Sequence, residues 1–84
     1  MTRDDIAKAF AEELENVAPD VDLSTAEPDE DLREAFELDS MDILNLVSAL
    51  HKRLGVDIPE ADYERMVTVK GAVDYLSGRL GAAA

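Results

Sequence analysis

The stretch that decides how this chain folds is Phe36-Glu37-Leu38-Asp39-Ser40-Met41-Asp42-Ile43-Leu44-Asn45-Leu46-Val47, an acidic turn that runs into an apolar helix. An Asp-Ser pair at the start of a helix is common, because short oxygen-bearing side chains satisfy the free amides of the first turn and acidic groups suit the positive end of the helix dipole. The simplest interpretation is therefore that Asp39 and Ser40 cap a helix. Whether Ser40 does more depends on the residues around it.

The helix that follows is expected to run from Ser40 to Leu54 and to be central in the fold. Gly55 is typical of the left-handed residue that stops a helix. Met41 and Leu44 lie at the edge of the apolar stripe, where they either meet partners or, in the case of Leu44, complete the core. The stripe itself repeats at spacings of three and four and consists of Ile43, Val47, Leu50 and Leu54, widened by Leu44 and Leu46.

A first helix and a long connection precede it. Thr2 opens a capping box, Pro19 ends the helix, and the stripe between them is Ile6, Phe10, Leu14 and Val17. Residues 18–39 show no sustained period and are expected to form a long loop, with a helical turn near residues 29–35. The expected anchors of this loop in the core are Leu23, Leu32, Phe36 and Leu38.

Two helical segments follow the central helix. The first, over residues 60–66, is too short to be stable without packing. The second begins at the capping residue Thr68 and ends at Gly78 or Gly81. Gly71 inside it costs about 1 kcal/mol relative to Ala unless a neighbour needs the close approach. The residues expected to be buried from these segments are Tyr63, Met66, Val69, Ala72, Val73 and Leu76.

These elements predict an all-α four-helix bundle with a long first loop and a short third helix, in a single domain over residues 1–84. The chain has 84 residues and no cysteine, so a disulfide, a thiol nucleophile and a cysteine-based zinc site are excluded. No apolar run is long enough to span a membrane, and Met1–Asp5 does not begin a signal peptide. We expect a cytoplasmic monomer.

The net charge of −12 is confined to one half of the chain. Residues 1–42 hold 15 acidic and 3 basic residues, whereas residues 43–84 hold 5 of each. Such a charge repels nucleic acids and anionic lipids, and it attracts basic protein surfaces. Repulsion within the chain also predicts that added salt raises the melting temperature.

Two kinds of functional site are disfavoured by spacing. Ser40 and His51 could form a hydrolase pair in principle, but 11 residues along one helix separate them by about 16 Å. The run from Asp20 resembles the opening of a calcium loop, yet it has Thr25 where Gly is required and Asp31 where Glu is expected. We therefore predict neither an enzyme active site nor a metal site.

Several segments together resemble an acyl carrier protein, a member of the phosphopantetheine-binding carrier family. Each segment is common alone, but their order and spacing in an acidic, cysteine-free chain of this length are specific, and they extend over essentially the whole chain. The segments are Asp39-Ser40-Met41-Asp42, Leu46-Val47 with Leu50, Ile58-Pro59, Thr68-Val69 and Ala72-Val73-Asp74-Tyr75-Leu76.

The resemblance implies that Ser40 carries 4′-phosphopantetheine from coenzyme A, and that the thiol of this arm holds acyl groups as thioesters. The chain would then be a phosphoprotein of fatty acid, polyketide or specialised lipid biosynthesis, and a carrier rather than an enzyme. The implied partners are a phosphopantetheinyl transferase and an acyl-loading ligase, acyltransferase or ketosynthase. The residues implied to contact these partners are Asp39, Met41 and Asp42, with Glu60, Asp62 and Glu64 as further acidic contacts.

Two departures from the family pattern matter. Glu37 stands where the family usually has Gly, so the turn must either place a side chain at positive φ or differ in its backbone. The helix after Ser40 is also less acidic than in fatty acid carriers, with Asn45, His51 and Lys52 at positions that are usually acidic, which favours a specialised pathway. The alternatives are an aminoacyl or peptidyl carrier, and an unmodified acidic adaptor for a basic protein.

Overall fold

The computed structural model describes residues 2–81, and every regular element in this part of the chain is helical. The all-α fold expected from the sequence is confirmed, and the long first loop and the short third helix are both present. The α-helices are α1 (Arg3–Val17), α2 (Leu32–Ala35), α3 (Ser40–Leu54) and α4 (Val69–Leu80), and the 3₁₀ helices are η1 (Leu23–Thr25) and η2 (Glu60–Val67).

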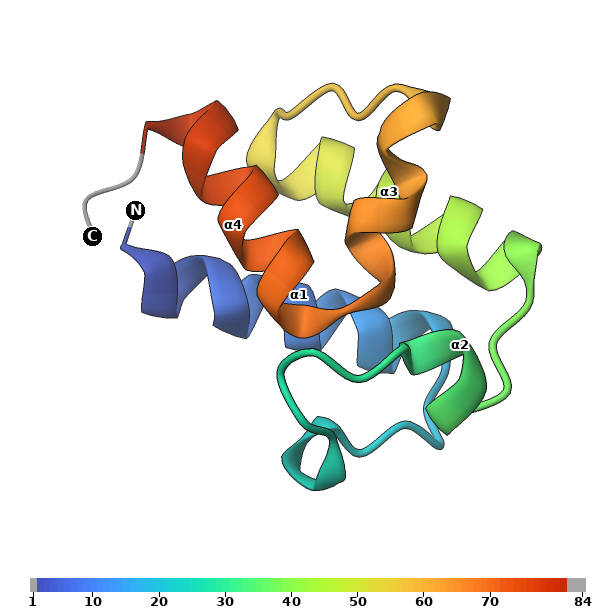
Figure 1. Cartoon of the computed structure of the whole chain (residues 1–84). Helices are drawn as coiled ribbons and strands as arrows, with labels where there is room; N and C mark the ends of the chain where they lie inside the picture. The colour runs from blue at the N-terminus through green and yellow to red at the C-terminus, as the bar shows by residue number, and fades with distance from the viewer. Residues whose placement is uncertain (1, 82–84) are drawn as a thin grey trace.

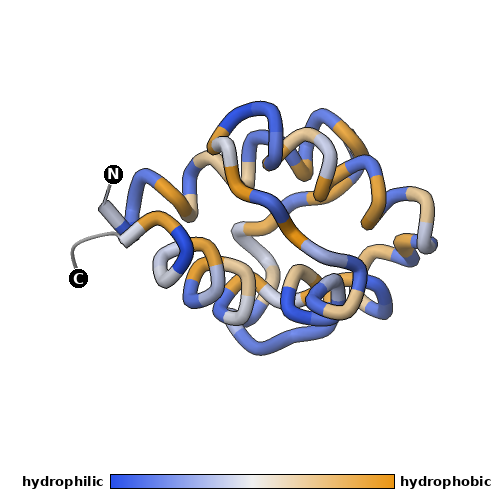
Figure 2. The backbone as a smooth tube through the Cα atoms, turned by 90° about the horizontal axis from the view of Figure 1, so that it is seen from above, coloured by the Kyte–Doolittle hydropathy of each residue, from blue (hydrophilic) through white to orange (hydrophobic). Residues whose placement is uncertain are grey.

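The helices enclose a single apolar core. α1 packs against both α3 and α4, while η2 packs against α3 and α4 (Figure 1). α1 and α4 run in opposite directions, so the start of α1 and the end of α4 lie on the same side of the molecule. Hydrophobic residues recur along the helices (Figure 2). The large side chains with almost no exposed surface are Ile6, Phe10, Leu14, Leu32, Leu46, Leu50, Met66 and Leu76.

The predicted helix ends agree with the structure where the signals are local. The capping box of α1 is present, because the Asp5 amide donates to Thr2 Oγ1 and the Thr2 amide donates to an Asp5 carboxylate oxygen, each at 3.1 Å. α3 ends at Leu54, and Gly55 follows in the left-handed conformation with φ of 69°. Its amide donates to the His51 carbonyl at 2.8 Å, which closes the helix as expected.

Hydrophobic side chains of the long loop anchor it in the core. Leu32 and Leu38 are buried as predicted, while Leu23 and Phe36 are only partly buried against the core. Val21 is a further buried anchor that the sequence pattern did not reveal. The loop also contacts the start of α4, because the Lys70 amide donates to the carbonyl of Pro28 at 2.8 Å.

The structure explains why residue 71, inside α4, is a glycine. A Cβ atom there would lie 2.9 Å from the Arg65 carbonyl oxygen of η2 and 2.7 Å from Thr68 Oγ1, which caps α4 by accepting from the Gly71 amide. The glycine therefore allows η2 and α4 to meet closely. Of the two predicted helix ends, Gly81 is the one observed, with φ of 64°.

The structure corrects the predicted burial of Leu44 and the type and length of the third helix. Leu44 is 41% exposed and therefore does not widen the core stripe of α3. The third helix is a 3₁₀ helix, one residue longer than predicted, and Tyr63 within it is partly buried and packs against the core as expected. Met66 and Val67 supply its buried contacts, since a 3₁₀ helix of eight residues must be held by packing.

Candidate functional site

Ser40 is the first residue of α3 and is exposed to solvent. The helix cap is Asp39, whose carboxylate accepts from the Asp42 amide at 2.9 Å, while the Asp42 carboxylate accepts from the Asp39 amide at 3.1 Å. The simplest sequence interpretation, in which Ser40 shares the capping role, is therefore wrong. Asp39 and Asp42 complete the capping box between them, and the serine hydroxyl is left available for chemistry.

The turn before Ser40 is the end of α2, and a residue other than glycine stands at its left-handed position. The Leu38 amide donates to the Arg33 carbonyl at 3.1 Å and the Phe36 amide donates to the Leu32 carbonyl at 3.0 Å, a pattern in which the intervening residue is left-handed and usually glycine. Here that residue is Glu37, with φ of 55°. The turn thus keeps the positive φ expected at this position and places a side chain there, at a cost in backbone strain.

A groove of about 230 Å³ opens beside Ser40, between α2, α3 and η2. Its walls are Arg33, Ser40, Ile43, Tyr63, Glu64 and Val67. Arg33 donates to both carboxylate oxygens of Asp31, at 3.2 and 2.9 Å, and this contact lowers the pKa of the Asp31 carboxyl below its usual range. The Arg33 side chain remains about half exposed, so it can meet an anion placed on Ser40.

These residues fit a phosphodiester-linked arm. The serine oxygen lies at a helix N-terminus, where backbone amides and the helix dipole favour negative charge. An arginine, a tyrosine and the carboxylate of Glu64 share the groove that such an arm would enter. Arg33 was not predicted as a site residue, because its place beside Ser40 depends on how α2 turns back toward α3.

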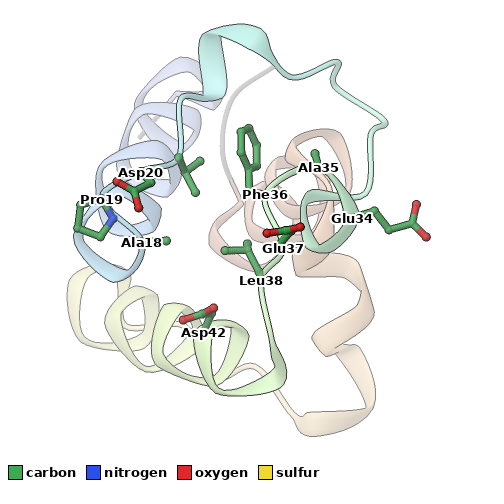
Figure 3. Close-up of a pocket in the computed structure, with 10 residues that line it drawn as sticks. Ala18, Pro19, Asp20, Glu34, Ala35, Phe36, Glu37, Leu38 and Asp42 are labelled. Carbon is green, nitrogen blue, oxygen red and sulfur yellow. The ribbon is translucent and has the colours of Figure 1, made fainter.

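A second hollow lies on the other side of the turn, between the end of α1, α2 and the start of α3, with a volume of about 410 Å³. Glu37 and Asp42 lie around it together with Asp20, while the Glu34 side chain extends outward (Figure 3). No basic side chain lines it. The acidic side chains around the hollow concentrate negative charge ahead of Ser40. Within residues 2–81, no three His, Cys, Asp or Glu side chains form a group that could hold a metal ion.

The residues predicted to contact partners occupy different environments. Met41 is 57% exposed, and Asp39, Glu60 and Glu64 are also exposed. Asp42 is partly buried in the capping box. Asp62 is partly buried and accepts the Tyr75 hydroxyl at 2.7 Å, so it joins η2 to α4. The role of all six in partner contact stays a prediction.

The three residues at the end of α3 that carry or can carry positive charge differ in their contacts. Arg53 donates to Glu12 at 2.7 Å and to Glu13 at 3.0 Å, which ties α3 to α1. His51 Nδ1 lies 3.1 Å from the Val56 carbonyl and 3.2 Å from the Asp57 carboxylate. His51 is thus a structural residue at the helix end, far from Ser40. Lys52 is exposed and has no ion-pair partner within residues 2–81.

The family of the chain follows from comparison with known proteins. A family model described as a phosphopantetheine attachment site matches residues 4–76, so the chain belongs to the phosphopantetheine-attachment family of carrier domains.

Curated relatives narrow the type of carrier. An acyl carrier protein of Rubrobacter xylanophilus is 39% identical over 67% of this chain and 69% of its own length. An acyl carrier protein of Campylobacter lari is 32% identical over 87% of this chain and 88% of its own length. Acyl carrier protein 2 of Pseudomonas aeruginosa is 44% identical over 57% of this chain and 61% of its own length. No solved structure matches the chain significantly.

Together the family model and these relatives show an acyl carrier role through covalently attached 4′-phosphopantetheine, and they disfavour the adaptor alternative. Within residues 2–81, no helix is both long and apolar enough to cross a membrane.

Proposed function

We propose that Ser40 Oγ is the atom that carries the 4′-phosphopantetheine arm. The observation that supports this most is the division of labour at the start of α3, where Asp39 and Asp42 complete the cap and Ser40 is exposed with no capping role. An exposed hydroxyl at the first helical position can enter the active site of a transferase without loss of the helix. The groove beside it offers Arg33 as a counter-charge for the phosphodiester.

The chain's own residues bind and orient, and in this proposal they catalyse no reaction. Arg33 and the α3 amides would hold the negative charge at Ser40, while Tyr63, Ile43 and Val67 offer apolar contact along the groove. When bound, the arm supplies a terminal thiol that forms thioesters with acyl groups. Absence of cysteine from the chain removes a competing thiol.

The enzymes that act on this carrier are expected to be a phosphopantetheinyl transferase and an acyl-loading ligase, acyltransferase or ketosynthase in the cytoplasm. We infer that they meet the acidic turn before Ser40 and the exposed Met41. Fatty acid, polyketide and specialised lipid synthesis all fit a carrier of this kind. The reduced acidity of α3 beyond Asp42 favours a specialised pathway.

Intact-mass measurement tests the attachment site. The purified chain is incubated with coenzyme A and a broad-specificity phosphopantetheinyl transferase, alongside Ser40→Ala and the control Ser48→Ala, which changes another exposed serine of α3. The wild type and Ser48→Ala should each gain one arm, and Ser40→Ala should gain none. A gain on Ser40→Ala, or no gain on the wild type, would contradict the proposal.

A folding control separates attachment from structure. Because Asp39 is the cap, Ser40→Ala should change the free energy of unfolding by less than about 0.5 kcal/mol. Asp39→Ala, which removes the capping carboxylate, should cost about 1 kcal/mol.

Asp42→Asn tests docking more cleanly than a charge reversal, since an amide oxygen can still accept the capping hydrogen bond while the charge is lost.

A further inference from the structure

The contact between η2 and α4 is centred on one tyrosine. Tyr75 of α4 donates its hydroxyl to the Asp62 carboxylate at 2.7 Å, and the guanidinium of Arg65 lies 5.8 Å from the centre of the tyrosine ring. Asp62 and Arg65 both belong to η2, which contacts α3 as well as α4 (Figure 1). One side chain of α4 therefore holds η2 through a hydrogen bond and a cation–π contact.

The geometry of a 3₁₀ helix gives η2 separate faces. Such a helix has about 3.0 residues per turn, so residues three apart lie on the same face. Asp62 and Arg65 share the face that meets Tyr75. Glu64 and Val67 share a different face, which lines the groove beside the candidate attachment serine. Because η2 is short, a shift of its first face relative to α4 also moves the wall of the groove.

The hydrogen bond to Tyr75 matters because η2 has little else to fix its orientation. Backbone hydrogen bonds have poorer geometry in a 3₁₀ helix than in an α-helix. Within residues 2–81, Asp62 is the residue of η2 whose side chain forms a hydrogen bond. Met66 and Val67 are buried, but apolar burial is not directional and does not fix how the helix is turned.

The chain that leads into η2 is attached to the same part of α4. Arg79 lies one turn after Tyr75, and its guanidinium is 5.4 Å from the centre of the tyrosine ring. The same guanidinium donates to the backbone carbonyl of Asp57 at 2.7 Å. Asp57 lies in the connection between α3 and η2. Residues gathered at Tyr75 thus hold both η2 and the segment that precedes it.

We propose that Asp62 and Tyr75 are positioning residues, which hold η2 at the place where the groove beside Ser40 limits the exposure of the arm and its thioester. Asp62 then acts through its hydrogen bond inside the molecule and not through its charge toward a partner. Glu60 and Glu64, which are exposed, remain the acidic side chains of η2 that a partner can reach. The inference rests on the proposed function, because it concerns the groove that would receive the Ser40 arm.

Amide hydrogen exchange, followed by NMR on the unmodified chain, tests the contact itself. Tyr75→Phe keeps the ring and removes the hydroxyl, while Asp62→Ala removes the acceptor. Each should raise the exchange rates over residues 60–67 by about three- to tenfold, as expected when local opening no longer breaks a hydrogen bond to a charged group. Asp62→Asn should keep exchange close to that of the wild type, because its amide oxygen still accepts from Tyr75.

Asp74→Ala is the matched control for stability. Asp74 is the neighbour of Tyr75 in α4, is exposed, and pairs with Arg3 of α1. That ion pair stays formed when η2 opens alone, so its loss should change exchange over residues 60–67 by less than about twofold. If Asp74→Ala raises this exchange as much as Tyr75→Phe does, η2 opens only together with the whole protein, and the proposal is wrong.

The consequence for the arm is measured on the protein that carries a hexanoyl thioester. Hydroxylamine cleaves the thioester, and intact mass follows the loss of the acyl group. Tyr75→Phe and Asp62→Ala should be cleaved about three- to tenfold faster than the wild type, whereas Asp62→Asn and Asp74→Ala should differ from it by less than about twofold.

Two results of the cleavage assay would overturn the proposal. Equal rates for Tyr75→Phe and the wild type would show that the hydroxyl does not control exposure of the arm. A rate for Asp62→Asn as high as that for Asp62→Ala would show that the charge of Asp62 matters and its hydrogen bond does not. Failure of the wild type to gain an arm at Ser40 would count against the proposed function, while the exchange experiment would still test the role of Asp62 and Tyr75.

Discussion

Replacing Glu37 by glycine should make this protein more stable, although it removes a side chain. Glu37 has φ of 55° in the turn that ends α2, and the left-handed region costs a residue with a Cβ atom about 1 to 2 kcal/mol. Glycine removes that cost but loses about 0.4 to 1 kcal/mol through the greater freedom of the unfolded chain. The net expectation is a stabilisation of about 0.5 to 1 kcal/mol, which corresponds to a rise in melting temperature of roughly 2 to 8 °C for a domain of this size.

The measurement must separate backbone strain from charge. Glu37 shares its hollow with Asp20, Glu34 and Asp42, so loss of its charge alone relieves some repulsion. Glu37→Gln keeps the Cβ atom and removes the charge, and Glu37→Ala keeps only the Cβ atom. Urea unfolding followed by circular dichroism should rank Glu37→Gly as clearly the most stable of the three variants.

Two results would refute the reasoning. If Glu37→Gln stabilises as much as Glu37→Gly, the relief is electrostatic and the positive φ contributes nothing. If Glu37→Gly is less stable than the wild type, the side chain makes contacts that outweigh the strain. Intact-mass assays on the same variants would show whether the turn also controls the modification of Ser40.

Four further predictions concern stability. Ser77 Oγ is buried with no hydrogen-bond partner in residues 2–81, so Ser77→Ala should stabilise by about 1 kcal/mol in urea unfolding, whereas Ser48→Ala should change little. Gly71→Ala should destabilise the protein by about 1 to 3 kcal/mol, because its Cβ atom would press on the Arg65 carbonyl. Gly78→Ala, whose Cβ atom meets nothing within 4 Å, should instead stabilise the protein by about 1 kcal/mol. Equal changes in stability for the two variants would show that the close contact at Gly71 is not what matters. Raising the salt concentration should raise the melting temperature, since the net charge is −12; a melting temperature independent of ionic strength would contradict this. Burial and the Asp62 contact raise the pKa of Tyr75 above its usual 10.0. The stability that the neutral Tyr75 hydroxyl contributes is therefore fully present below about pH 10 and is lost as the pH rises through the raised pKa. Tyr75→Phe should lose less stability at alkaline pH than the wild type.

The helices that carry the site were predictable because their signals are local. The capping boxes at Thr2 and Asp39 join residues three apart, and Gly55 stops α3 through a bond to His51 four residues away. Such contacts form within one turn and depend little on the rest of the chain. The apolar repeats of α1 and α3 then predicted which faces are buried, with Leu44 as the exception.

The long loop was predicted only in outline. Leu32 and Leu38 were identified as anchors from their type and position, but Val21 was not, because a loop residue has no period that distinguishes a buried side chain from an exposed one. The hydrogen bond from Lys70 to Pro28 joins segments that are far apart in sequence. No local pattern could have indicated it.

What the sequence by itself determined is the class of fold, the bounds of α3 and the candidacy of Ser40, since these depend on hydrogen bonds and apolar spacings within a few residues. Only the tertiary structure decided which charges remain free around them. Arg53 is bound by two glutamates of α1 and Asp62 by Tyr75 of α4, whereas Lys52 is left exposed and Arg33, although paired with Asp31, is brought beside Ser40. The physical reason is that a side chain's charge is screened or satisfied by whatever packing places within a few ångströms, and those neighbours come from distant parts of the chain.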